Sequence, residues 1–273
     1  IEGDITDVSS VINIFKNIGG FSLKGTNSAD RILSVLNLFT DGRLEWTAEQ
    51  LMEVLGYSRP TMYRYLRSLK DAGLLVSISN SLLTLGPRVV EMDFLIRKSD
   101  PLLTHGKVHI SQLAMTYPST ALLVRWYGDK MLCVDTESST KNYFTSYTRG
   151  RPMALVRGAI ARTIVANLPR TDLENHINLH LEEFKKIGLG KNFNGVLESF
   201  LKVKKNRVCI AEQEMTPGVI GIASPILDTN RYPIGAICVT MALNPFSSMD
   251  VNTVVAEDVK LRSEKLSNKM GAH

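Results

Sequence analysis

Apolar residues between positions 28 and 70 recur at intervals of three and four, a pattern typical of amphipathic helices. The first predicted helix has Ser28 as its N-cap and stops at Asp41-Gly42. The second runs from Thr47 to Gly56 and is about two turns long. The third starts at Arg59-Pro60, because proline in a first turn removes no helix hydrogen bond. This order, with a tight glycine turn before the third helix, predicts a helix-turn-helix.

The third predicted helix has one apolar face and one basic face. Its apolar residues are expected to pack inward, whereas Tyr63, Arg64 and Arg67 share the opposite face. Residues 59–70 include four basic side chains and no acidic one. Arginine can read guanine edges and hydroxyl groups can hold phosphates, so this face suits the major groove of DNA. The expected DNA-binding residues are Ser58, Arg59, Pro60, Thr61, Tyr63, Arg64, Arg67 and Lys70.

A predicted hairpin follows this helix and decides between two interpretations of its basic face. A basic helix face taken alone is more often a solvated surface than a binding site. Here residues 74–78, the polar turn Ser79-Asn80-Ser81 and residues 82–85 form two short apolar strands joined tightly. A hairpin directly after three helices predicts a winged helix-turn-helix, and this context favours DNA binding.

The rest of the chain mixes helical and strand-like patterns. A helix is expected at 101–117, and a hairpin pairs strands at 120–127 and 130–137 around Gly128-Asp129. Further strands are expected at 206–214, 219–227 and 232–242, and further helices at 153–167, 172–186, 193–204 and 250–268. Hairpins beside separate helical blocks predict an α+β domain with a mainly antiparallel sheet and a single ligand pocket.

Length and charge agree with two domains but add little to the DNA prediction. The 273 residues exceed the roughly 150 of one average domain. The net charge is +5, yet residues 1–100 carry 11 basic and 12 acidic residues, whereas residues 101–273 carry 21 and 15. The positive excess therefore lies outside the predicted DNA-binding domain, and the DNA prediction rests on the local basic helix.

Cysteines and histidines indicate neither a cofactor nor a metal site. Cys133, Cys209 and Cys238 lie far apart in apolar runs, which predicts buried thiols in a reducing cytoplasm. Two histidine pairs have the spacing of zinc ligands but no obvious third ligand: His105 with His109, and His176 with His180. No apolar run is long enough to span a membrane, and the first residues lack the basic start of a signal peptide. We expect a cytoplasmic protein with no metal and no cofactor.

Short motifs in both halves of the chain resemble those of the IclR family of bacterial transcriptional regulators. The N-terminal motifs are Ala29-Asp30-Arg31-Ile32-Leu33, Leu51 to Gly56, Ser58 to Leu69, Ala72-Gly73-Leu74-Leu75 and Leu83-Thr84-Leu85-Gly86. The C-terminal motifs are Gly150-Arg151-Pro152-Met153, Asn167-Leu168-Pro169, Pro217-Gly218-Val219, Ile222-Ala223-Ser224-Pro225-Ile226 and Gly235-Ala236-Ile237-Cys238-Val239. Each motif is loose by itself, but their order and spacing over residues 28–268 are specific.

The resemblance implies a winged domain for operator DNA, a linker helix and an α/β domain for a small effector, in a dimer or tetramer. The expected boundaries are an N-terminal arm at 1–26, a DNA-binding domain at 27–86, a linker helix at 87–100 and an effector-binding domain at 101–273. The apolar residues of the linker helix predict either contact with a second subunit or burial within the same chain.

The expected effector pocket centres on residues 150–160, where a polar loop leads into a helix whose free N–H groups could bind a carboxylate. The resemblance places Ala159 and Ile160 at backbone positions that hold the effector carboxylate. It places the family's acidic position at or near Ala211, with Glu212 adjacent. Arg157 departs from the family pattern and either pairs with an acid in the pocket or faces solvent. The expected effector-binding residues are Arg157, Ala159, Ile160, Glu212, Cys238 and Thr240.

These features predict a ligand-responsive regulator that places two winged domains on a pseudo-palindromic operator. The expected mode is repression released by a small organic acid, semialdehyde or aromatic compound. The alternative is a cytosolic enzyme that acts on a small carbonyl compound through Cys238 or a histidine pair, with the N-terminal domain as a docking module. No base and orienting group stand at convincing spacing for this alternative.

Overall fold

A computed structural model describes residues 27–79, 81–139, 145, 147–243 and 249–271. The chain forms two compact units, Ile1–Ser99 and Asp100–His273. The expected arm at 1–26 and Asn80 of the predicted turn lie outside the described residues. No helix in the described part of the chain combines the length and the apolar character needed to cross a membrane.

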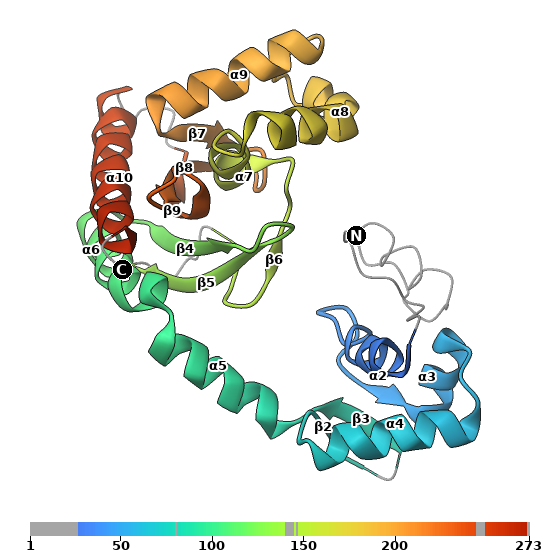
Figure 1. The fold of residues 1–273 in the computed structure, drawn as a ribbon. Helices are drawn as coiled ribbons and strands as arrows, with labels where there is room; N and C mark the ends of the chain where they lie inside the picture. The colour runs from blue at the N-terminus through green and yellow to red at the C-terminus, as the bar shows by residue number, and fades with distance from the viewer. Residues whose placement is uncertain (1–26, 80, 140–144, 146, 244–248, 272–273) are drawn as a thin grey trace. The chain divides into compact units, whose positions relative to one another are not determined.

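The first unit packs α2 (Ser28–Leu36), α3 (Ala48–Leu55) and α4 (Arg59–Asp71) against a small antiparallel sheet (Figure 1). The sheet has the order β1-β3-β2, from β1 (Trp46–Thr47), β2 (Leu75–Ser77) and β3 (Leu82–Leu85). Trp46, Leu51 and Met62 are fully buried in its core. The winged helix-turn-helix is confirmed, and β1 is an additional strand too short to give an alternating pattern.

Side-chain caps fix where the helices of this unit begin. The Asp30 N–H donates to Asn27 Oδ1 at 2.9 Å, so Asn27 is the N-cap of α2 and the prediction of Ser28 is wrong. The predicted start of the second helix at Thr47 is confirmed, and Thr47 is the N-cap of α3. Its hydroxyl accepts the Gln50 N–H at 3.2 Å, and the Gln50 side chain accepts the Thr47 N–H at 3.0 Å. This reciprocal pair is a capping box.

Helix α5 (Pro87–Ser99) follows the wing. None of its residues is buried, and Val90, Phe94 and Leu95 are exposed apolar side chains. Its apolar residues are spread around the helix and do not pack into the core of the first unit, and both interpretations of this helix stay predictions.

The second unit is built on a six-stranded sheet in which every neighbouring pair is antiparallel, in the order β6-β5-β4-β9-β8-β7 (Figure 1). Its strands are β4 (Thr120–Trp126), β5 (Met131–Ser138), β6 (Pro152–Met153), β7 (Cys209–Glu212), β8 (Val219–Leu227) and β9 (Pro233–Ala242). Its helices are α6 (Pro101–Thr116), α7 (Gly158–Val165), α8 (Arg170–Lys186), α9 (Phe193–Asn206) and α10 (Met249–Met270). The predicted α+β class and antiparallel sheet are confirmed.

Helices cover both faces of this sheet. Because successive strand residues point to opposite faces, Leu122 and Cys238 pack towards α7, α8 and α9, whereas Leu123 and Ile237 pack towards α6 and α10. Both faces are consequently apolar, and most residues of the central strands β4, β8 and β9 are buried.

The helix predicted from Met153 begins five residues later, at Gly158. Pro152 and Met153 instead pair with β5 as the edge strand β6. Gly158 has a φ of +84°, a left-handed conformation that side-chain-bearing residues rarely adopt. The start of α7 is thus set by strand pairing and a glycine turn, which the apolar periodicity of the segment does not reveal.

Candidate DNA-binding helix and ligand pocket

Helix α4 separates its buried residues from its basic ones. Met62, Tyr65, Leu66 and Leu69 are buried against the core of the first unit. Thr61 is half-buried, and the other seven predicted DNA-binding residues are exposed: Ser58, Arg59, Pro60, Tyr63, Arg64, Arg67 and Lys70. The structure therefore brings the predicted residues together on one accessible helix face and its N-terminal end.

Local contacts hold several of these side chains in place. The Ser58 hydroxyl donates to Thr61 Oγ1 at 3.0 Å, and the Ser58 side chain makes no capping bond to the backbone of α4. Lys70 Nζ donates to the Ser77 hydroxyl at 2.8 Å and so ties the helix to strand β2 of the wing. Arg67 lies 3.8 Å from Asp71, with both side chains largely exposed, so this ion pair contributes little.

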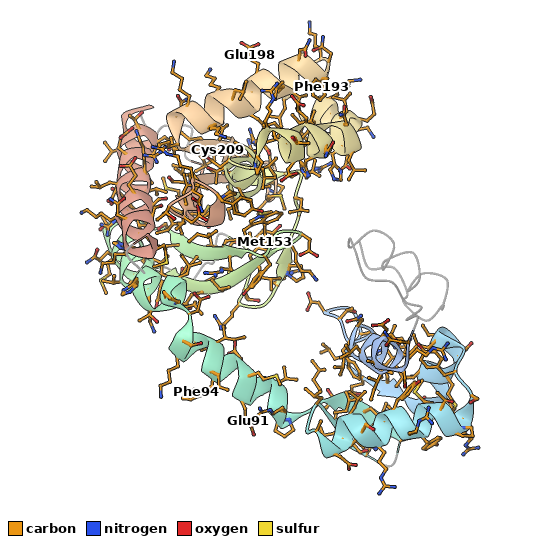
Figure 2. All side chains as sticks on the ribbon, in the orientation of Figure 1. Glu91, Phe94, Met153, Phe193, Glu198 and Cys209 are labelled. Carbon is orange, nitrogen blue, oxygen red and sulfur yellow. The ribbon has the colours of Figure 1, made fainter. Side chains whose placement is uncertain are left out.

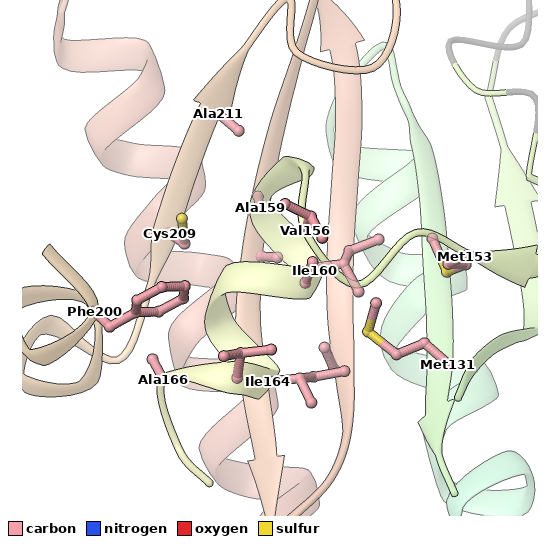
Figure 3. Close-up of a cluster of buried hydrophobic side chains, with 14 of the residues drawn as sticks. Met131, Met153, Val156, Ala159, Ile160, Ile164, Ala166, Phe200, Cys209 and Ala211 are labelled. Carbon is pink, nitrogen blue, oxygen red and sulfur yellow. The ribbon is translucent and has the colours of Figure 1, made fainter. Parts of the chain in front are cut away.

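A cavity of about 590 Å³, including its open mouth, lies in the second unit beside the start of α7. Apolar side chains make up most of its wall, and Figure 3 shows Met131, Met153 and Ile160 among them. Its lining residues are Leu122, Met131, Thr145, Tyr147, Met153, Ala154, Arg157, Gly158, Ala159, Ile160, Ala161, Ala211, Glu214, Met215, Thr216, Val219, Gly221, Cys238 and Thr240. An apolar cavity with a few polar groups is the usual form of a small-molecule site.

Five of the six predicted effector-binding residues line this cavity: Arg157, Ala159, Ile160, Cys238 and Thr240. Arg157 is the N-cap residue of α7. It lines the cavity and is also exposed to solvent. Ala159 and Ile160 are buried in the first turn of the helix. Their role in binding stays a prediction.

The sixth residue, Glu212, does not line the cavity. It is exposed on β7, while its neighbour Ala211 points inward and Glu214 supplies the acidic group. Strand alternation continued past Glu212 would direct Glu214 outward. Instead the strand ends, and Gln213 adopts a left-handed φ of 54° that breaks the alternation. The spacing of the two glutamates in the sequence gives no sign of this turn.

Glu214 makes two contacts with α7. Its Oε2 accepts the Gly158 N–H at 2.9 Å, and its Oε1 pairs with Arg162 of the same helix. The Arg162 and Glu214 side chains are only 11% and 19% exposed. An internal carboxylate therefore lies at the helix end where the sequence predicted an effector carboxylate.

The thiol and hydroxyl groups of the cavity are poor nucleophiles. Burial raises the pKa of the Cys238 thiol, so this group stays protonated. The Thr240 hydroxyl donates to the Thr120 carbonyl at 3.1 Å. All three cysteines are buried and free. Among the described cavity residues, Cys238 is therefore not an activated nucleophile, and the Thr240 hydroxyl is held by the backbone of β4.

Neither predicted histidine pair lines this cavity. The rings of His176 and His180 have centroids 4.8 Å apart, and His176 bonds the Leu155 carbonyl through Nε2. Burial lowers the pKa of His176 to about 4, and the nearby His180 adds to this effect. Within the described ranges, no three histidine, cysteine, aspartate or glutamate residues gather closely enough to hold a metal ion.

Two family models match this chain. Residues 28–78 match the IclR helix-turn-helix domain, and residues 96–268 match the family described as bacterial transcriptional regulator IclR C-terminal. The HTH-type transcriptional regulator KipR of Bacillus subtilis is 23% identical over 88% of this chain and 95% of its own length.

Solved structures share the fold at low identity. An IclR transcriptional regulator from Alicyclobacillus acidocaldarius has a TM-score of 0.72 at 17% identity, covering 91% of this chain and all of its own. An IclR homologue from Microbacterium hydrocarbonoxydans, solved with 4-hydroxybenzoate, has a TM-score of 0.71 at 15% identity, covering 90% and 100%.

Proposed function

Because the chain belongs to the IclR family of bacterial transcriptional regulators, we propose that α4 reads an operator while the cavity beside α7 senses a small organic effector. The protein acts in the cytoplasm as a repressor that its effector releases from DNA. The effector belongs to the organic acids, semialdehydes or aromatic compounds. The homologue bound to 4-hydroxybenzoate supports a small-molecule ligand.

The exposed basic face of α4 is the observation that carries the DNA-binding role. Arg64 and Arg67 project from a helix whose other face is anchored in the core. Such a helix can enter the major groove without losing its packing, because the side chains that hold it and those that contact DNA are different.

A homo-oligomer is supported by α5. Val90 is 72% exposed and Phe94 is 63% exposed, and Figure 2 shows Phe94 projecting from the helix. A second copy of the chain covering these residues would place two winged domains on one pseudo-palindromic operator. Phe94→Ser is expected to shift the protein towards monomer in sedimentation, whereas Lys98→Ser on the same helix leaves its mass unchanged.

The DNA-binding role is tested with an operator selected from a random duplex library by the full-length protein. Arg64→Ala or Arg67→Ala is expected to weaken operator binding by about 1–3 kcal/mol, roughly fivefold to 150-fold. Arg67→Lys distinguishes a contact to a phosphate from a contact to a base. It retains charge for a phosphate but loses the planar fork that reads a base.

Lys202→Ala on α9, an exposed basic residue of the other unit, is the matched control and leaves affinity unchanged. Affinities are measured by fluorescence anisotropy at several salt concentrations, because each lost phosphate contact lowers the salt slope by about one. Wild-type affinity and salt slope in both Arg64→Ala and Arg67→Ala would contradict the assignment of α4.

The cavity is proposed to bind its ligand without converting it. Neither the protonated Cys238 thiol nor the Glu214 carboxylate, which is paired with Arg162, supplies an activated nucleophile or an unpaired base. Turnover of a small carbonyl compound that is abolished by Cys238→Ala would overturn this part of the proposal.

A further inference from the structure

Glu214 lies at the start of α7, where backbone chemistry favours an anion. Helix α7 begins at Gly158, and the first N–H groups of a helix carry partial positive charge. The Gly158 N–H already donates to Glu214 Oε2 at 2.9 Å. The loop that carries Glu214 is closed on itself, since the Gly218 N–H donates to the Gln213 side chain at 3.1 Å.

The second oxygen of Glu214, Oε1, also has a partner. Oε1 pairs with Arg162, which lies one turn along the same helix. Among the described residues, Arg162 Nε is buried without a hydrogen-bond partner. Removing Glu214 from this place would therefore leave a poorly solvated guanidinium with neither charge compensation nor sufficient hydrogen bonds, which is unfavourable.

The Met215 side chain lies beside the same helix end. A Cβ built on Gly158 would lie 3.1 Å from Met215 Cγ, so this side chain rests against the glycine. The other polar side chains that line the cavity are mostly uncharged, including Tyr147, Thr216 and Thr240. Arg157 is exposed, and an ion pair to a guanidinium in water contributes little to affinity.

We propose that Glu214 is a built-in occupant of the anion-binding end of α7, so that the cavity selects uncharged ligands over carboxylates of the same shape. A carboxylate ligand would either lie against the Glu214 carboxylate, where like charges repel, or displace it and do no more than replace the bonds that Glu214 makes to the Gly158 N–H and to Arg162. An amide, alcohol or aldehyde meets neither obstacle. This inference rests on the proposed ligand-binding role of the cavity and narrows the class of effector.

The experiment measures binding of acid and amide pairs to the full-length protein by calorimetry. The pairs are propionate with propionamide, benzoate with benzamide, and 4-hydroxybenzoate with 4-hydroxybenzamide. For at least one pair, the wild type is expected to bind the amide about tenfold more tightly than the acid. Glu214→Ala is expected to tighten acid binding about tenfold or more, and to change amide binding less than about threefold.

Glu212→Ala is the matched control, because it removes an exposed carboxylate from the same segment outside the cavity. Its acid and amide affinities should equal those of the wild type. Glu214→Gln keeps a side-chain oxygen for the Gly158 N–H and is the second variant if Glu214→Ala does not fold. It should raise acid affinity about threefold or more, since it removes the charge but not the bulk.

Equal preference for acid and amide in the wild type, or unchanged acid affinity in both Glu214 variants, would overturn the proposal. Tight acid binding to the wild type that is lost in Arg157→Ala would also overturn it, since the exposed guanidinium would then dominate. If neither the wild type nor a Glu214 variant binds any of the probes, the ligand-binding role of the cavity is refuted, and this proposal is refuted with it. Probe binding that leaves operator affinity unchanged would instead refute only the effector role and leave the selectivity of Glu214 standing.

Discussion

Replacing Gly158 with alanine tests the backbone turn that starts α7. Gly158 has a φ of +84°, and a residue with a Cβ pays roughly 1–2 kcal/mol to adopt a left-handed conformation. The added Cβ would lie 3.1 Å from Met215 Cγ, closer than ordinary contact. Met215 is flexible and 44% exposed, so moving it should cost less than the roughly 1–3 kcal/mol of overpacking a rigid core. We expect a total destabilisation of about 1–3 kcal/mol.

Gly218→Ala is the matched control for this substitution. Gly218 has a φ of +70°, and no described atom would lie within 4 Å of its Cβ. Gly218→Ala therefore has the backbone cost of a left-handed residue but no close side-chain contact. The difference in unfolding free energy between the two variants gives the cost of the contact with Met215. Gly218 is also absent from the cavity wall, so only Gly158→Ala should change ligand affinity.

Urea unfolding monitored by tryptophan fluorescence measures both effects. The chain has two tryptophans. Trp46 lies in the first unit and Trp126 in the second, so a Trp46→Phe background makes Trp126 the reporter of the second unit. A stability of Gly158→Ala equal to or above that of the parent would refute the left-handed turn. A loss exceeding that of Gly218→Ala by about 3 kcal/mol or more would refute the ability of Met215 to move.

Three further predictions concern stability. Thr47→Ala removes the capping box of α3 and should destabilise the first unit by about 1 kcal/mol, measured by Trp46 fluorescence; an unchanged midpoint would contradict the cap. Gly106→Ala places a Cβ 2.5 Å from Leu123 Cδ2 and should cost about 1–3 kcal/mol, with partial recovery in a Leu123→Ala background; additive losses would argue against the clash. The pKa of His176 is lowered to about 4, so the unfolded state binds more protons between pH 4 and 6.5. Stability should therefore fall as pH drops through this window, by up to about 1.4 kcal/mol per unit, and less so in His176→Gln; identical pH profiles would refute the shift.

Much of the architecture was predictable because its signals are local. Thr47 with Gln50, and proline in the first turn of α4, mark helix starts within a few residues of sequence. The alternation of Leu122 and Leu123 between two apolar faces is also a property of consecutive residues in a strand. The prediction of Ser28 as the N-cap of α2 was wrong, because Asn27, directly before it, is an equally good capping residue and accepts the Asp30 N–H.

The candidate pocket was predictable only in part. Cys238 and Thr240 lie on a long strand whose direction the pattern gives correctly, and they reach the cavity wall. Glu212 does not reach the cavity wall, because a left-handed residue at Gln213 ends the alternation and Glu214 lines the wall instead; a role of Glu212 in binding stays a prediction. A single positive φ at a residue other than glycine has no reliable signature in sequence.

Periodicity, capping and motif order were enough to predict the winged domain, the basic face of α4, the α+β class and the family. Each of these signals acts over a few residues. The place of Glu214 at the start of α7 depends instead on the folded chain, because its partners Gly158 and Arg162 lie more than fifty residues earlier in the sequence. A hydrogen bond and an ion pair depend on distance in space, and that distance was set by packing β7, β8 and α7 together.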